Sequence, residues 1–372
     1  MNIIFIALQL SQPRCIKRIK AIYDAGFKVK VYGFDSGLYN ETLKSLPFPV
    51  ERIIKRDKSK KKLTKLKEFR ICLKQILKEN SNNDLYYLFG FEIASMAWLL
   101  GYKNYIYEEA DVTAARVSNP FIRNLLLSID RVVIKKSYRT VLTSEGFIKC
   151  IFPTNKPVNK LIMMPNKLSP YFDAYKKAQV KSLPIDFNHI KFGFIGLIRY
   201  PNTIVRFARV IGKFFPNHEF HFWGDTEYDE YLDNEIKSFS NVYIHGRFKN
   251  PDDLLKIYTN TDISVVCYDT SSGNVLIAEP NKIYESIFFE TPIVVSSGTY
   301  LAERVKQFNA GFDIKADNDD SIRVFVNSIK ESILMQIITS IREISWQETV
   351  EDASYLIDSI KSYCYDGKEK SN

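Results

Sequence analysis

The chain has 372 residues, of which 45% are apolar and 26% are charged. This composition is typical of globular proteins and excludes a disordered chain, and the length corresponds to two or three domains. No apolar run approaches the roughly 20 residues of a membrane-spanning helix, and the apolar start lacks the basic region of a signal peptide. The five cysteines form no CxxC pair, which indicates neither a disulfide framework nor a zinc site. We therefore expect a reduced, cytoplasmic chain.

The net charge of +9 is divided unevenly along the sequence. Residues 1–190 hold 33 Lys and Arg against 16 Asp and Glu, a net of +17, whereas residues 191–372 hold 19 against 27, a net of −8. This asymmetry predicts that the first half meets an anionic surface.

Short apolar runs alternate with amphipathic stretches in the first half. A helix is expected at residues 13–25, ending at Gly26. Strands are expected at residues 3–8, 28–32, 85–89, 105–107 and 140–143. Alternation of this kind predicts a parallel sheet with helices on both faces.

The pattern loosens near residue 165 and restarts near residue 190. A helix is expected at residues 203–214, and strands at residues 190–195, 220–223, 242–245, 263–266 and 292–296. The sequence thus predicts two similar α/β domains, residues 1–168 and 190–345, joined by a linker at residues 169–189.

Two common nucleotide-binding loops are missing from the sequence. The turn after the first strand, residues 8–14, has no glycine, and neither GxGxxG nor GxxxxGK[ST] occurs. A nicotinamide dehydrogenase and a phosphate-loop ATPase are therefore disfavoured.

The most distinctive segment is residues 279–296, EPNKIYESIFFETPIVVS. Pro280 suits a first helical turn, whose free N–H groups attract anions. Lys282 adds a cation there, and Glu285, one turn on, shares its face and has two oxygens for a ribose diol. The alternative is a surface ion pair on an ordinary helix.

This segment resembles the donor-binding signature of family-four retaining glycosyltransferases, in which a helix opening P-x-K-x-x-E precedes a strand with the pattern P-V-V-x-S. Other matching segments follow in the order of that family: 144–147 (SEGF), 164–167 (MPNK), 194–200 (FIGLIRY), 221–225 (HFWGD), 242–247 (VYIHGR) and 345–348 (SWQE). The resemblance covers nearly the whole chain. It implies the GT-B architecture: two Rossmann-like α/β domains facing each other across a cleft, with a C-terminal helix in residues 346–372 crossing back to the first domain.

The resemblance also implies a reaction. A sugar would pass from a nucleotide-diphosphate donor to a lipid-linked or oligosaccharide acceptor with retention, without a metal or other cofactor, in surface polysaccharide synthesis. Arg199 and Lys282 would stabilise the charge on the departing phosphate. The implied donor site comprises Gly196, Arg199, Gly224, Asp225, Arg247, Asn274, Asn281, Lys282 and Glu285.

The sequence departs from the family at two places. Ile277 stands where the family often has a first Glu, so contacts to the transferred sugar are expected from the loop before it, at Ser272, Gly273 or Asn274. No His lies near the expected acceptor side of the first domain. The loop expected after the strand at residues 105–107 instead carries Glu108, Glu109 and Asp111, one of which is expected to position or deprotonate the acceptor hydroxyl. The alternative is that all three are loop carboxylates, with Asp111 capping a helix.

Basic residues are concentrated in residues 52–78, which hold 12 of them, including Lys60, Lys61 and Lys62. Residues 120–136 mix apolar runs with further basic residues. Together they predict peripheral binding to the anionic inner face of a membrane. Arg14 is expected either to contact acceptor phosphate or to be solvated at its helix start.

Two alternatives remain open. The basic half is compatible with nucleic-acid binding, but no helix-turn-helix, RNA-binding aromatic motif or zinc module occurs, so no nucleic-acid partner is expected. A sugar-nucleotide epimerase has the same architecture and would act on a nucleotide sugar without any acceptor.

Overall fold

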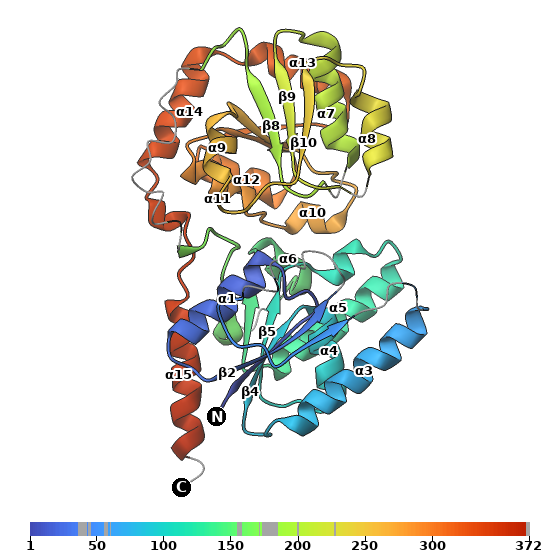
Figure 1. Cartoon of the computed structure of the whole chain (residues 1–372), viewed down its shortest axis with the longest axis vertical. Coiled ribbons are helices and arrows are strands. Elements are labelled where there is room, and N and C mark those ends of the chain that lie inside the picture. The colour runs from blue at the N-terminus through green and yellow to red at the C-terminus, as the bar shows by residue number, and fades with distance from the viewer. Residues whose placement is uncertain are drawn as a thin grey trace. The chain divides into compact units, whose positions relative to one another are not determined.

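The computed structural model describes residues 1–35, 43, 46–55, 59, 61–154, 158–170, 172, 185–198, 201–226 and 228–369. The chain forms two compact units (Figure 1). The first comprises Met1–Pro165 and Asp352–Asn372, and the second comprises Asn166–Glu351. Each unit has its own parallel sheet, so the prediction of two α/β domains is confirmed. Most of the expected linker lies outside the described residues.

The sheet of the first unit has seven parallel strands in the order β3-β2-β1-β4-β5-β6-β7. They are β1 Ile3–Ala7, β2 Val29–Asp35, β3 Arg52–Lys55, β4 Leu85–Phe89, β5 Tyr105–Glu109, β6 Arg139–Leu142 and β7 Leu161–Met163. The strand order reverses between β1 and β4, which makes this pair the topological switch point of the sheet. β1 and β4 are buried along their whole length, which accounts for their uninterrupted apolar sequences.

Among the described residues of the first unit, five helices follow these strands: α1 Pro13–Asp24, α3 Lys62–Glu79, α4 Phe91–Leu99, α5 Pro120–Lys136 and α6 Gly146–Ile151. Pro13 and Pro120 stand at helix starts, where a missing N–H costs nothing. The side chain of Asn119 caps α5 by accepting from the amides of Phe121 and Ile122.

The last helix, α15 (Ser354–Glu369), belongs to the first unit. Leu356 and Ile360 are fully buried in the apolar cluster that contains Ile19 and Ile22 of α1. The hydroxyl of Tyr138 donates to the carbonyl of Ser359 at 2.9 Å. The return of the C-terminal helix to the first domain is therefore confirmed. The helix begins at residue 354 and not at residue 346.

The second unit has six parallel strands in the order β10-β9-β8-β11-β12-β13. They are β8 Lys191–Ile195, β9 Glu219–Trp223, β10 Val242–Gly246, β11 Ile263–Val266, β12 Ile293–Ser296 and β13 Gly311–Ile314. The helices are α7 Pro201–Phe214, α8 Asp229–Ile236, α9 Leu254–Thr259, α10 Gly273–Ile277, α11 Lys282–Phe288, α12 Tyr300–Gln307, α13 Asp319–Ser328 and α14 Glu331–Glu343.

No single helix among the described residues is long and apolar enough to cross a membrane. The bent pair α13 and α14, with an angle of 86° between the helices, meets the length and composition of a span only when the two are taken together. Both helices bury apolar residues in the core clusters of the second unit, including Ile322, Phe325 and Ile337.

Candidate active site

Glycines end three neighbouring strands of the second unit. The amide of Gly196, after β8, donates to the carbonyl of Trp223 at 2.7 Å, and the amide of Gly224, after β9, donates to the carbonyl of Gly246 at 2.8 Å. Gly224 has φ +140°, and a Cβ there would lie 1.9 Å from the carbonyl oxygen of Gly196. The close approach of these backbones therefore requires glycine at position 224.

The residues that follow Gly224 and Gly246 form an ion pair. Nη2 and Nε of Arg247 lie 2.6 Å and 2.8 Å from the same oxygen, Oδ2 of Asp225. The Arg247 side chain is 69% exposed, so this pair contributes about 0–1 kcal/mol to stability. The structure thus brings together two predicted donor-site residues at the carboxyl end of the sheet and leaves them open to solvent.

Lys282 and Glu285 form a second, buried ion pair. Nζ of Lys282 lies 2.5 Å from Oε2 of Glu285, and the two side chains are 9% and 2% exposed. The other carboxylate oxygen, Oε1, accepts from Nδ2 of Asn281 at 2.5 Å. Helix α11 begins at Lys282, so Pro280 lies before the first turn and not in it. Three predicted donor-site residues therefore contact one another.

Tyr258 of α9 completes this group and was not predicted. Its hydroxyl donates to Oε2 of Glu285 at 2.9 Å, and the residue is fully buried. Burial, and then the charge of Glu285, raises the pKa of Tyr258 well above its ordinary value, so the hydroxyl keeps its proton. Sequence spacing gave no signal for Tyr258, because it comes from a different helix, 27 residues before Glu285.

A second buried carboxylate lies beside this group. Glu279 accepts from Nε of Arg304 at 2.9 Å and from the hydroxyl of Tyr284. These contacts fix the segment that leads into α11. Of the remaining predicted donor residues, Asn274 is buried in α10, and Arg199 lies outside the described residues.

Glu108 and Glu109 lie inside strand β5 and not in the loop after it, which corrects the prediction. Both are fully buried. Oε1 of Glu108 accepts from Nη1 of Arg14 at 2.6 Å, and Oε2 accepts from Nε of Arg18 at 3.0 Å. Burial alone would raise the pKa of Glu108, but the charges of Arg18 and Arg14 outweigh it and hold the pKa below its ordinary value. Arg14 is thus paired within the protein and not solvated.

Glu109 lies with Tyr107 and with Asp130 of α5, on the opposite face of the strand from Glu108. Burial, and then the charge of Asp130, raises the pKa of Glu109 well above its ordinary value, and burial raises the pKa of Asp130 to about 7. The three groups perturb one another, yet neither Glu109 oxygen has a hydrogen-bond partner of ordinary geometry among the described residues. Burial and the neighbouring carboxyl favour the protonated form of Glu109, and burial leaves it without contact to solvent.

The remaining predicted residues of the first unit are more open. Oδ2 of Asp111 lies 3.0 Å from Nη2 of Arg116, and both side chains are nearly half exposed. Lys61 is exposed before α3, and Lys62 is the first residue of α3. Lys60 lies outside the described residues.

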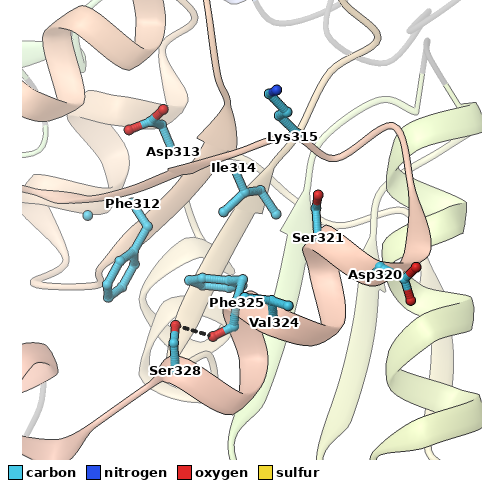
Figure 2. Close-up of a pocket in the computed structure, with 10 residues that line it drawn as sticks. Phe312, Asp313, Ile314, Lys315, Asp320, Ser321, Val324, Phe325 and Ser328 are labelled. Carbon is cyan, nitrogen blue, oxygen red and sulfur yellow. Dashed lines mark hydrogen bonds between the residues drawn. The ribbon is translucent and has the colours of Figure 1, made fainter.

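Two hollows lie at β13 of the second unit. One of about 600 Å³ lies between β13 and α13, where Phe312 and Ile314 face the helix and Asp313 projects to the other side of the strand (Figure 2). No predicted site residue lines it. The other, of about 80 Å³, lies at the carboxyl ends of β12 and β13 and is lined by Thr203, Asp269, Thr270, Ser296, Ser297, Ile314, Lys315, Ala316 and Asp317.

The smaller hollow has a polar lining that was not predicted. The hydroxyl of Thr203, in the first turn of α7, is buried and has no hydrogen-bond partner among the described residues. Polar residues a few positions after β11 (Asp269 and Thr270) and at the end of β12 (Ser296 and Ser297) are the sequence signal for this hollow.

No family model and no curated protein sequence matches this chain. Solved structures match it over almost its whole length. HepE of Anabaena, solved in complex with UDP, has a TM-score of 0.71 and 14% identity over 98% of this chain and 100% of that one. Sucrose-phosphate synthase of Thermosynechococcus elongatus has a TM-score of 0.70 and 12% identity over 100% of both chains. UDP-GlcNAc 2-epimerase of Neisseria meningitidis, bound to UDP-GlcNAc, has a TM-score of 0.63 and 13% identity over 93% of this chain and 95% of that one. At these identities the likeness establishes the fold, and that fold is GT-B.

Proposed function

We propose that this protein is a retaining glycosyltransferase that moves a sugar from a nucleoside-diphosphate donor to an acceptor hydroxyl. The observation that carries the proposal is the buried Lys282–Glu285 pair with Asn281, within a chain of GT-B fold. Three of the structures that share the fold are HepE complexes with UDP, with UDP and glucose, and with UDP-glucose, which supports a nucleotide sugar as the substrate.

Catalysis in this proposal is electrostatic. When the bond between the sugar and the diphosphate breaks, negative charge grows on the departing phosphate, and a cation already in place lowers the barrier. Lys282 is that cation, with Arg199 as the second, and no metal is required. Glu285 accepts hydrogen bonds from the ribose hydroxyls.

The acceptor side is assigned by elimination among the three first-unit carboxylates. Glu108 forms ion pairs with two arginines, and Glu109 lies beside Asp130. Both glutamates are buried. Asp111 is the one of the three that an acceptor hydroxyl reaches from solvent. We assign to Asp111 the positioning of that hydroxyl.

A nucleotide-binding assay on two variants tests the proposal. Thermal shift with UDP, GDP, dTDP and ADP identifies the preferred base, because a ligand at 100 times its Kd stabilises by about 2.7 kcal/mol. Glu285→Gln removes the charge and should weaken binding of the preferred nucleotide by about 1.5–3 kcal/mol. Asp358→Asn is the matched control, since Asp358 also pairs with a lysine three residues away, at 3.1 Å, but is 69% exposed. Stabilisation by none of the four nucleotides would overturn the proposal.

The epimerase alternative is separated from the transferase by the requirement for an acceptor. The Neisseria meningitidis epimerase shares the fold, so the fold alone does not decide between them. An epimerase converts a nucleotide sugar when nothing else is present. The proposed transferase leaves the nucleotide sugar unchanged until an acceptor is added.

Helix α5 supports peripheral binding to the inner face of a membrane, where a lipid-linked acceptor would be found. Phe121, Leu125 and Val132 lie within roughly 40° of one another around the helix axis at 100° per residue. They are 77%, 52% and 37% exposed, whereas Asp130 on the opposite side is buried. Asp130 is also the sole acidic residue of α5, and the exposed Lys135 and Lys136 lie on either side of the apolar residues around the helix axis, within about 60° of Phe121. An exposed helix face that is apolar and basic suits an anionic lipid surface.

Vesicle sedimentation tests the membrane proposal. The double variant Phe121→Ser and Leu125→Ser should bind phosphatidylglycerol vesicles more weakly, and Lys61→Gln should lower the salt sensitivity of binding, because one fewer cation contributes to the attraction that salt screens. Val324→Ser, which changes a 69% exposed apolar residue of the second unit, is the control and should leave binding unchanged. Wild-type protein that binds an oligonucleotide but not these vesicles would favour the nucleic-acid alternative.

A further inference from the structure

The carboxylate of Glu285 already accepts from three donors within the protein, two of which share Oε2. Lys282 and Tyr258 donate to Oε2 at 2.5 Å and 2.9 Å, and Asn281 donates to Oε1 at 2.5 Å. The residue is 1% exposed. Since Oε2 already accepts twice, a ribose hydroxyl reaches this oxygen only if Lys282 or Tyr258 leaves it.

The three donors differ in how easily they leave. The ring of Tyr258 is fully buried and stacks on Phe289, with 4.7 Å between centroids and 12° between planes. The lysine has a flexible stem, and its Cε lies 3.2 Å from the position of a Cβ on Gly196, at the end of β8. Since Gly196 has no side chain, Nζ of Lys282 can move over that backbone away from Glu285.

We infer that the Lys282–Glu285 pair is a latch over Oε2 of Glu285, that the diphosphate of the donor opens it by drawing Lys282 away, and that Tyr258 is the positioning residue that holds Glu285 in place. This inference rests on the proposed function, because it assigns an order of events to the same site. A diphosphate offers Lys282 a competing anion. Once Nζ moves to the phosphate, the oxygen it leaves becomes available to the ribose hydroxyls.

The latch predicts that a ligand without phosphates binds poorly for two reasons. It gains nothing from Lys282, and it must displace the lysine from Glu285 without offering it another partner. Removing the lysine charge should therefore lower the affinity for ligands with phosphates and raise the affinity for ligands without them. A simple contact between Lys282 and the donor would not raise the affinity for ligands without phosphates.

The first test is Lys282→Met, with UDP and uridine as probes, or the corresponding pair for the preferred base, measured by calorimetry. UDP affinity should fall roughly ten-fold or more, because a charge-assisted contact to phosphate is lost. Uridine affinity should rise several-fold, because no ion pair has to be broken. Unchanged or weaker uridine binding overturns the latch even if UDP binding falls as expected. Wild-type protein that binds no nucleotide overturns the proposed function itself.

The second test is Tyr258→Phe, which removes one hydroxyl and keeps the ring stack. The matched control is Tyr105→Phe, whose buried hydroxyl donates to a backbone carbonyl, that of Val133, at 2.8 Å in the first unit. Both variants should have a lower Tm. Only Tyr258→Phe should raise the donor KM, by roughly ten-fold, while kcat stays near the wild-type value. An unchanged KM in Tyr258→Phe would make the hydroxyl purely structural and overturn its positioning role.

Discussion

Nε of Arg18 lies 3.0 Å from Oε2 of Glu108, and both side chains are completely buried. Arg14 supplies a second guanidinium to the same carboxylate. Breaking a buried pair by removing one charge leaves the other charge uncompensated in a medium of low polarity. Glu108→Gln should therefore lower the free energy of unfolding by about 3–5 kcal/mol, as measured by denaturant titration.

Glu79→Gln is the control for the Glu108 prediction. Glu79 also pairs with an arginine, Arg52, at 2.8 Å, but the side chains are 38% and 32% exposed for Arg52 and Glu79. Loss of this exposed pair should lower the free energy of unfolding by about 0–1 kcal/mol. Equal effects of the two substitutions would contradict the structural role of Glu108.

The buried carboxyls Glu109 and Asp130 predict a pH dependence of stability. Because burial raises the pKa of Asp130 to about 7, the folded state keeps its proton between about pH 4 and about pH 7, where the unfolded state has lost it. The stabilisation is present at the acid end of this window and declines as the pH rises, by up to roughly 1.4 kcal/mol per pH unit. Asp130→Asn removes the titrating group and should flatten this decline.

Denaturant unfolding of the wild type and of Asp130→Asn at pH 5, 6, 7 and 8 measures the effect. The variant should gain stability relative to the wild type as the pH rises. Asp358→Asn, an exposed carboxylate of α15 paired with Lys361, is the control and should follow the wild type. A constant difference between Asp130→Asn and the wild type at all four pH values would argue against a proton held by this pair.

Alanine at Gly224 would clash with a neighbouring backbone, whereas alanine at Gly246 would meet only an unfavourable φ angle. Alanine at Gly224 would place its Cβ 1.9 Å from a backbone oxygen, so β8 and β9 must move apart. Alanine at Gly246, with φ +73° and no atom within 4 Å of the new Cβ, meets only the strain of a left-handed conformation, about 1–2 kcal/mol. We expect Gly224→Ala to lose more stability and to lose nucleotide binding, both measured by thermal shift with and without the nucleotide. A Gly246→Ala variant that is the less stable of the two would contradict this order.

Because the Asp225–Arg247 pair is exposed, we expect its loss to change nucleotide affinity without changing stability. Arg247→Ala should change Tm little, since the arginine is 69% exposed. If the pair lines the donor site, as expected from the sequence, the same substitution should weaken nucleotide affinity. A large loss of Tm with unchanged affinity would assign the pair a purely structural role.

The strands were predictable because buried parallel strands are continuous apolar runs. Leu85–Phe89 was located without error, and Ile3–Ala7 to within one residue. The contact between Lys282 and Glu285 was also predictable, because residues three apart share a helix face.

The environment of Glu108 could not be predicted in the same way. Two adjacent glutamates in a sequence are usually solvated, and the arginines that neutralise Glu108 come from α1, 90 and 94 positions earlier. Tyr258 presents the same difficulty, because its role depends on α9 packing beside α11. Long-range pairing of polar groups follows from the folded sheet and leaves no local periodicity.

Because α15 belongs to the first unit, that unit cannot finish folding until the C-terminal residues have been synthesised. The chain leaves the first unit at Pro165 and re-enters it at Asp352. A ribosome that adds roughly 5–20 residues per second needs roughly 10–40 s to make the intervening segment. Throughout that interval Ile19 and Ile22 lack the partners that Leu356 and Ile360 later supply. The second unit therefore has its complete sequence first, and the nascent first unit carries an uncovered apolar surface that a chaperone can bind until the last helix emerges.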